Sequence, residues 1–492
     1  MPSRLSRFLP GLKPHPVDDA RPVEQKTQEK HVGAIHRATS AEAFEAARRN
    51  KLRRYPSPEA GGERLYPLAS PAVSPGFTIG KDDSVFAVGS CFARNLEGAL
   101  HKAGMNVLSR HPDLGPIGEA VGAASNFLNK YTAPSILNDL GWALERDSFP
   151  GEKIIYRVSD EVYCDPQLGL VRLPYPMAEI MEMRSRYLDA MAQVAQADVV
   201  ILTLGYVEAW YDKELGVYLN IAPPPQICKS APDRFEFRVL GFEDVRTALE
   251  DIYSLLKRHR RKPLKMLLTV SPVPLLSTFR DMDVLVANAY SKSVQRAAAE
   301  TFVADKADVD YFPSYETVTL SDPAVCWARG DYRHVSPDLV ARIMSNVLVN
   351  YAPDIGAPGT CHGAAMTTQA TLATARMLLK LDESAELAAF FTDNRGILRD
   401  DEKLLARIAD KLQESGQSRA AAEVLEEMVA LAPKRPRLLQ RLISVASTDP
   451  ERSDYTRALL ATHAESFPTR HDFRQRIERI LDSRGPAGHS HS

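Results

Sequence analysis

The sequence predicts an α/β fold, a three-layer α/β/α sandwich around a parallel sheet of five strands, with an all-α domain after it. Two observations predict the sandwich. Short apolar runs recur between residues 66 and 355, and amphipathic segments of helical periodicity separate them. Fully apolar strands that alternate with such helices form parallel sheets covered on both faces. The all-α domain is predicted by the composition from residue 365 onward, which turns to Ala, Leu, Glu and Arg with almost no β-branched runs.

The expected strands are short and apolar, and in chain order they lie at residues 85–88, 106–109, 198–205, 265–272 and 309–315. Helices are expected between them, for example in FEDVRTALEDIYSLLKRHR at residues 242–260. Two long insertions interrupt the alternation, at residues 111–180 and 211–240, and the first contains a hairpin candidate in KIIYRVSDEVYCD. Insertions of this length in a compact domain are usually lids over a site or unordered segments.

The chain is expected to hold several parts. Residues 1–65, rich in Pro, Arg, Glu and Gln, form a poorly ordered extension with one short helix near SAEAFEAARRNKLRR. The sandwich takes residues 66–355, a linker takes 356–364, the α-helical domain takes 365–485 and a disordered tail takes 486–492. In the helical domain, LLARIADKLQESGQSRAAAEVLEEMVALAPKR has the apolar spacing of a tetratricopeptide hairpin. An ordinary helical bundle is the alternative, because such repeats need several stacked copies for stability.

Charge and cysteine content narrow the class of protein. The formal net charge is −2, from 61 basic and 63 acidic residues, so no overall field attracts nucleic acid or an anionic membrane. Five cysteines without CxxC spacing favour a reducing compartment, and we expect a cytoplasmic protein. No stretch has the length and apolarity of a membrane span or a signal peptide. The histidines and cysteines show no metal-ligand spacing, so neither a metal nor a cofactor is assigned.

Ser90 lies where the first strand meets the next helix, in SVFAVGSCFARN. Hydroxyls at the carboxyl end of a parallel strand point into the crevice where open α/β sheets bind ligands. The start of a helix also supplies N–H groups that can stabilise an oxyanion. The alternative is that Ser90 only caps the helix. For Cys91 the helix dipole would lower the thiol pKa, but its side chain is rotated by about 100° from that of Ser90, and we expect it to be a packing residue.

A nucleophilic serine needs a base and a group that orients the base. Asp331 and His334 are three residues apart in DYRHVSPDLV, directly before a helix that Ser336 and Pro337 begin. The apolar face of that helix docks on the sheet and so fixes the loop before it. The order of five βα units brings this loop, after the last strand, within reach of the loop after the first. His334 is therefore the candidate base for Ser90, with Asp331 as its partner.

Four stretches of the chain resemble one protein family. They are GSCFARN, SNFLNKYTAPSI, TLGYVEAWYD with the later TVSPVPL, and DYRHVSPD, which together span most of residues 80–355. These stretches resemble the GSCFA family, a branch of the SGNH-hydrolase or GDSL-like superfamily. The resemblance implies a flavodoxin-like sheet in which Ser90 is the nucleophile, His334 the general base and Asp331 its partner. It also implies that the Ser90 main-chain N–H forms part of an oxyanion hole.

One block departs from the superfamily pattern. The superfamily completes its oxyanion hole with a glycine from a second block and an asparagine from a G-x-N-D block, where this chain reads GYVE at residues 205–208. No asparagine occupies the expected place. The donor is instead Asn95, Asn126 or a main-chain amide.

Three residues of the same stretch are candidates for substrate contact. Gly205, Glu208 and Trp210 follow the end of a central strand, close to the expected crevice. Trp210 either stacks on a sugar or acyl group or packs in the core.

These residues favour a serine ester hydrolase that removes an acyl group, such as acetyl, from a carbohydrate or similar polar substrate. A role in polysaccharide modification is implied by the family resemblance alone. An O-acyltransferase acting on a glycan would use the same three residues, and exclusion of water by the lid would decide between the two. The third hypothesis is a non-catalytic protein that binds glycans and recruits a protein partner through the helical domain.

Overall fold

The computed structural model describes residues 35–483, apart from residues 111, 122–123, 170–171, 329, 357–360 and 382. Residues 1–34 of the expected extension, part of the expected linker and the expected tail therefore lie outside the described residues. The chain divides into two compact units, Met1–Arg53 and Arg54–Ser492. In the first unit, helix α1 (Ser40–Arg49) begins at a capping box between Thr39 and Glu42, and none of its residues is buried.

The core of the second unit is a five-stranded parallel sheet, in the order β11-β10-β6-β1-β2. Its strands are β1 (Ser84–Gly89), β2 (Asn106–Val107), β6 (Val199–Leu204), β10 (Lys265–Val270) and β11 (Val309–Tyr311). All five predicted strands are present, which confirms the α/β prediction. Strands β1 and β6 are neighbours at the point where the strand order reverses, and open parallel sheets bind ligands at such points.

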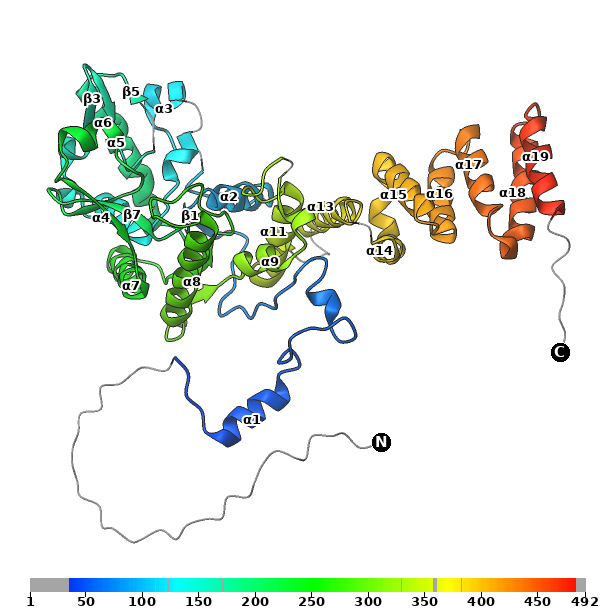
Figure 1. Ribbon diagram of the computed structural model, residues 1–492, viewed down its shortest axis with the longest axis horizontal. Coiled ribbons are helices and arrows are strands. Elements are labelled where there is room, and N and C mark those ends of the chain that lie inside the picture. The colour runs from blue at the N-terminus through cyan, green and yellow to red at the C-terminus, as the bar shows by residue number, and fades with distance from the viewer. Residues whose placement is uncertain are drawn as a thin grey trace, which may run out of the picture. The chain divides into compact units, whose positions relative to one another are not determined.

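Helices cover both faces of this sheet (Figure 1). In β1, Val85 and Ala87 point to one face and Phe86 and Val88 to the other, as the two-residue period of a strand requires. The first face packs against α2 (Phe92–Lys102), α9 (Ser314–Leu320) and α11 (Pro337–Tyr351). The second face packs against α4 (Ala133–Leu144), α5 (Met177–Ala192), α7 (Phe242–His259) and α8 (Val284–Val303).

The two insertions form small antiparallel sheets. The first contains α3 (Gly115–Val121), β3 (Tyr156–Ser159), β4 (Val162–Cys164) and β5 (Arg172–Leu173), so the predicted hairpin is present. The second forms a sheet of order β8-β7-β9, from β7 (Glu208–Asp212), β8 (Val217–Leu219) and β9 (Phe235–Val239), with α6 (Pro225–Ser230) after β8. The two insertions contact each other, since the Tyr156 hydroxyl donates a hydrogen bond to Asp212 at 2.7 Å.

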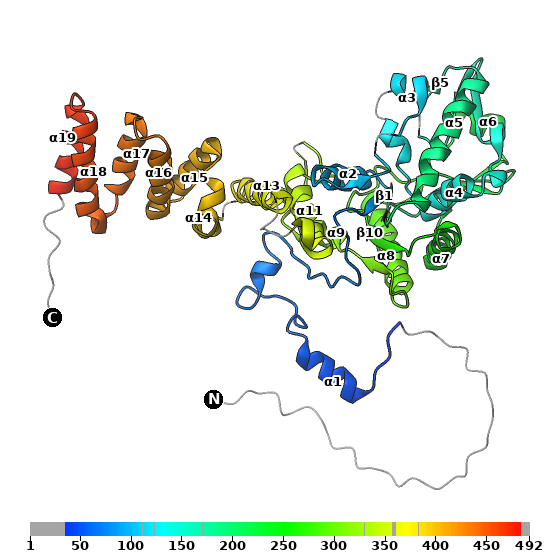
Figure 2. The ribbon, with the colours of Figure 1, turned by 180° about the vertical axis from the view of Figure 1, so that it is seen from behind.

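The described chain beyond α11 is helical, which confirms the all-α prediction (Figure 2). Its helices are α12 (Pro353–Gly356), α13 (Cys361–Leu378), α14 (Ser384–Leu398), α15 (Glu402–Glu414), α16 (Ser418–Leu431), α17 (Pro436–Ala446), α18 (Ser453–Ser466) and α19 (His471–Asp482). Helix α13 packs on α11, where Arg376 pairs with Asp338 at 2.8 Å. Helices α15 and α16 form the predicted hairpin, and its tetratricopeptide character stays a prediction. None of the helices that the structure describes is long and apolar enough to cross a membrane.

Candidate active site

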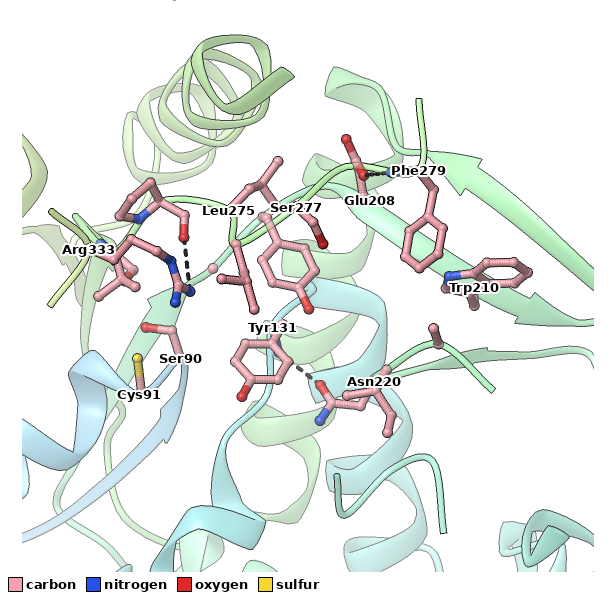
Figure 3. A pocket seen from close by; sticks show the side chains of 18 of the residues that line it. Ser90, Cys91, Tyr131, Glu208, Trp210, Asn220, Leu275, Ser277, Phe279 and Arg333 are labelled. Carbon is pink, nitrogen blue, oxygen red and sulfur yellow. Dashed lines mark hydrogen bonds between the residues drawn. The ribbon is translucent and has the colours of Figure 1, made fainter. Parts of the chain in front are cut away.

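A cavity of about 380 Å³ opens at the carboxyl ends of β1, β6 and β10 (Figure 3). Among the residues with polar or ionisable side chains that line it are Ser90, Cys91, Arg333 and His334. The turn after β6, the second insertion and the segment after β10 supply a wall of aromatic and aliphatic side chains, among them Tyr206, Trp210, Phe237, Leu275 and Phe279. A polar site against an apolar wall is the usual composition of a small-molecule pocket.

Ser90 directly follows β1. The backbone conformation at the preceding position, 89, requires glycine. Gly89 has a φ of +132°, and a Cβ at this position would lie 2.1 Å from the Thr203 carbonyl oxygen. The Ser90 side chain is almost buried, and the residue is 3% exposed. Its Oγ lies 3.0 Å from Thr203 Oγ1 and accepts the N–H of Phe92, the first residue of α2, at 3.3 Å. The hydroxyl therefore lies at the positive end of a helix, where a developing negative charge is stabilised.

The main-chain N–H of Ser90 already has a partner. It donates to the Thr203 carbonyl at 2.9 Å and so continues the pairing of β1 with β6. The family resemblance implies that this N–H belongs to an oxyanion hole, but in the structure it points into the sheet. A second expectation, that Ser90 caps α2, is met in part by the Phe92 contact.

Asp331 and His334 lie on a short loop that is closed at its base. Trp327 and Val335 form an isolated β-bridge, after the short helix α10 (Pro323–Cys326) and before α11. The Ala328 N–H donates to the His334 carbonyl at 2.7 Å and adds a second link across the loop. This local pairing fixes the loop before its residues reach the cavity.

The Asp331 carboxylate orders both the loop and the imidazole. Its Oδ2 lies 2.5 Å from His334 Nδ1, and its Oδ1 accepts the main-chain N–H groups of Arg333 and of His334, the latter at 2.9 Å. Hydrogen bonds from the side chain and backbone of His334, and from the backbone of Arg333, lower the pKa of Asp331 to about 2. The carboxylate is therefore charged at neutral pH and holds the imidazole with Nδ1 protonated, which leaves Nε2 as the acceptor.

The structure brings Ser90 and His334 to the same cavity but does not join them by a hydrogen bond. The serine hydroxyl is turned toward Thr203, and the His334 side chain is 59% exposed. In ligand-free enzymes, contacts of this kind are often longer than in the reacting complex.

Cys91 differs from the sequence expectation in two ways. Its side chain lines the cavity beside Ser90 (Figure 3), where we expected it to turn away into the packing. Burial raises the pKa of its thiol, and the positive charge of Arg333 opposes this only in part. The expected lowering by the helix dipole is therefore outweighed by loss of solvent.

Neither of the asparagines expected as oxyanion donors, Asn95 and Asn126, lines the cavity, whereas Gly205, a candidate for substrate contact, does. Asn95 is exposed because it lies on the outer face of α2, whose inner face carries Phe92 and Leu96. Asn126 is exposed in the short 3-10 helix Ala124–Leu128.

Glycine is required at position 205 by close approach of the backbone. A Cβ at Gly205 would lie 2.6 Å from the Tyr131 carbonyl oxygen, which accepts the N–H of Tyr206 at 2.8 Å.

Glu208 and Trp210 both line the cavity, with different surroundings. The buried carboxylate of Glu208 accepts the Thr278 hydroxyl at 2.6 Å and the Phe279 N–H at 3.2 Å, so it holds the segment after β10 in place. Trp210 meets Phe279 edge to face, with ring centroids 5.2 Å apart, and Phe237 at 5.7 Å. Trp210 is thus part of an aromatic cluster and of the cavity wall at once.

Arg333 and Asn220 line the cavity and were not identified from the sequence. The amide of Asn220 is engaged in the scaffold, since it accepts the Tyr131 N–H at 2.9 Å and donates to the Asn129 carbonyl at 2.9 Å. Arg333 is adjacent to His334 in the motif that predicted the base, which is the signal that could have drawn attention to it.

Lys292 on α8 is another group that the sequence reasoning missed. Its side chain is fully buried, and its Nζ donates to the carbonyls of Gly205 at 2.5 Å and Val273 at 2.8 Å, both on residues of the cavity wall. Burial lowers the pKa of Lys292 to about 7. The sequence signal that could have found it is the position of Lys292 among Ser291 and Gln295, which lie on the same buried side of α8.

The parallel sheet makes this an α/β protein, and the hydroxyl beyond β1 and the histidine–aspartate pair before α11 line one cavity of it or lie beside that cavity. Residues 84–346, more than half of the 492-residue chain, match the model of the GSCFA family. The chain belongs to the GSCFA family, and this membership suggests a hydrolase-like function. We found no match to it among curated proteins or among solved structures.

Proposed function

We propose that this protein is a serine ester hydrolase in which Ser90 is the nucleophile, His334 the general base and Asp331 the group that orients the base. The observation that carries the proposal is the shared cavity: the hydroxyl after β1 and the paired imidazole before α11 line one pocket, although 244 positions separate Ser90 from His334. The proposed substrate is an acyl ester, such as an acetyl ester, of a carbohydrate or similar polar compound.

In the first half of the reaction, the Ser90 hydroxyl turns from Thr203 toward His334. Its Oγ attacks the ester carbonyl while His334 Nε2 takes the proton, and the carbonyl π pair moves onto oxygen. The tetrahedral intermediate collapses, the C–O bond to the alcohol breaks, and the proton on Nε2 passes to the leaving alkoxide. Ser90 is left acylated, and the imidazole is neutral again.

In the second half, water takes the place of the alcohol. Nε2 removes a proton from the water as its oxygen attacks the acyl carbonyl, and collapse of the second intermediate breaks the bond to Ser90 Oγ. The proton returns to Oγ, and the carboxylic acid leaves. A sugar hydroxyl in place of water would give acyl transfer with the same three side chains.

The cavity wall supports a carbohydrate rather than a long acyl chain. A volume of about 380 Å³ holds an acetyl group and one sugar ring but lies near the small end of ligand pockets. Trp210, Phe237 and Phe279 present ring edges and faces to it, and the apolar face of a sugar packs on such rings.

The test is labelling with a fluorophosphonate and turnover of an activated acetyl ester by the purified full chain. We expect wild type to do both and Ser90→Ala to do neither. Ser293→Ala removes an exposed serine of α8 and should behave as wild type. Labelling or turnover that persists in Ser90→Ala would show that Ser90 is not the nucleophile. Acetylated oligosaccharides, followed by mass spectrometry with and without an acceptor sugar, would then separate hydrolysis from acyl transfer.

A further inference from the structure

Several expected donors for an oxyanion are not available beside Ser90. The Ser90 N–H is bonded to the Thr203 carbonyl, and residue 207, where the superfamily has asparagine, is a buried valine. Asn95 and Asn126 do not line the cavity, and the amide of Asn220 is bonded to two main-chain groups. Apart from main-chain amides that line the cavity, such as those of Cys91 and Gly205, a site that cleaves esters through Ser90 can use another group that bears hydrogen-bond donors or positive charge.

Arg333 supplies such a group at the right place. Its side chain lines the cavity with Ser90, and Figure 3 shows the guanidinium directed toward Ser90 and Cys91. The positive charge also reaches the thiol next to Ser90, where it opposes the upward shift of the Cys91 pKa.

The guanidinium of Arg333 has few partners among the described residues. One nitrogen donates to the Pro274 carbonyl at 3.5 Å, and Nε is buried without a hydrogen-bond partner. Asp331, two residues away, is occupied by the His334 imidazole and by two main-chain N–H groups. By contrast, Arg234 in the second insertion forms a 2.6 Å ion pair with Asp212. A buried donor without a partner calls for an explanation, and for Arg333, which lines the cavity with Ser90, a bound ligand group supplies one.

We propose that the guanidinium of Arg333 stabilises the oxyanion formed when Ser90 attacks the ester, in place of the asparagine and main-chain donors of the superfamily. This rests on the proposed role of Ser90. Arg333 donates hydrogen bonds to the carbonyl oxygen as the π pair moves onto it, and these bonds weaken when the pair returns on collapse. No proton leaves the guanidinium, because its conjugate base is too strong at any working pH.

The experiment compares Arg333→Gln and Arg333→Lys with wild type on a neutral activated acetyl ester. A neutral substrate offers the guanidinium no charge to bind before the reaction. We expect Arg333→Gln to lower kcat/KM by about 10²–10³-fold, mainly through kcat, as loss of an oxyanion donor does. Arg333→Lys should recover part of the loss, because it keeps the charge. The affinity for a boronic acid, which forms an anionic tetrahedral adduct with the serine, should fall in parallel with kcat/KM across the variants.

Arg280→Gln is the matched control. Arg280 follows the same wall segment, but its guanidinium lies 5.2 Å from the centroid of the Tyr290 ring and does not line the cavity. This variant should turn over as wild type does, and thermal unfolding of all variants checks that the fold is kept.

Three results would overturn the inference while the proposed function stands: a kcat of Arg333→Gln within a few-fold of wild type, a rise in KM alone, or an unchanged boronic acid affinity. If wild type shows neither turnover nor labelling at Ser90, the proposed function fails, and the role of Arg333 fails with it.

Discussion

His334 Nδ1 lies 2.5 Å from Asp331 Oδ2, while Oδ1 of the same carboxylate accepts the His334 main-chain N–H at 2.9 Å. One side chain thus fixes both the ring and the backbone of the proposed base. In a site on a loop, such double attachment replaces the rigidity that a helix or strand would give.

Asp331→Asn should therefore lower kcat by about 10²–10⁴-fold, because a neutral amide neither fixes the tautomer nor stabilises the imidazolium. The pKa of Asp331 is about 2 owing to its hydrogen bonds with His334 and the Arg333 backbone, so the carboxylate stays ionised at every pH well above that value. Any loss of wild-type activity on mild acidification must then come from a group other than Asp331. The pH dependence of kcat/KM measures this. Asp354→Asn, at an exposed position of α12, is the control and should match wild type.

From the burial of Lys292 we predict how the free energy of unfolding changes with pH. Burial lowers the pKa of Lys292 from 10.5 to about 7, and a negative charge on Cys91 acts in the opposite direction. Between these two values the unfolded chain binds a proton that the folded chain does not, so the free energy of unfolding should rise with pH through this window. Each pKa unit corresponds to about 1.4 kcal/mol, and we expect a total effect on the order of a few kcal/mol.

The test compares the free energies of unfolding of wild type and Lys292→Met, measured with urea between pH 6 and 10, about the range in which Lys292 titrates. The advantage of wild type over this variant should grow with pH. The variant also loses the bonds to the Gly205 and Val273 carbonyls, but that cost is the same at every pH. Lys229→Met, at an exposed lysine of α6, should show no such trend. A constant difference between wild type and Lys292→Met would contradict the lowered pKa.

Gly205→Ala should destabilise the protein and distort the cavity. Its Cβ would lie 2.6 Å from the Tyr131 carbonyl oxygen and 3.1 Å from the Tyr131 Cα, and both are backbone atoms that cannot turn aside. Overpacking of this kind costs about 1–3 kcal/mol. Gly98→Ala is the control, because a Cβ there meets nothing within 4 Å and α2 gains helix propensity of up to about 1 kcal/mol. Thermal unfolding should shift in opposite directions for the two variants.

Cys91→Ala should keep turnover and fluorophosphonate labelling. The thiol lines the cavity, but burial raises its pKa, so it is protonated and a poor nucleophile at neutral pH. We also expect iodoacetamide to modify the Cys91 thiol of the wild-type protein slowly at neutral pH and faster at high pH, where the thiolate forms. Loss of labelling in Cys91→Ala would indicate that Cys91, and not Ser90, is the nucleophile.

The sequence was most informative where the signal is local. All five strands of the main sheet are apolar runs that need no distant partner to be seen, and the Asp331–His334 pair is three residues apart. The contacts that shape the cavity are long-range. Glu208 holds Thr278 across 70 positions, and Ser90 meets Thr203 across 113. The first contact follows from the packing of the second insertion on the segment after β10, and the second follows from the pairing of β1 with β6. No pattern within any one of these segments records either contact.

The packing of helix α13 on α11 indicates where the chain can be shortened without loss of turnover. Helix α13 packs on α11, the helix that follows the His334 loop, and Ala375 and Met377 of α13 share a core with Ile343 of α11. Arg376 pairs with Asp338 at 2.8 Å, and Arg342 donates to the Thr374 hydroxyl at 3.3 Å. A chain ending at Ile355 should therefore unfold at a lower temperature and lose turnover, because α11 loses this cover and the loop before it loses its support.

A chain ending at Leu381 keeps α13 and removes α14 to α19. We expect it to retain the turnover of the full chain, since none of the cavity residues lies beyond His334. Circular dichroism and thermal unfolding of both shortened chains, together with ester turnover, make the comparison. Equal activity of the two would show that α13 gives the site no support, and loss of activity in both would mean that the later helices help to hold α13 in place.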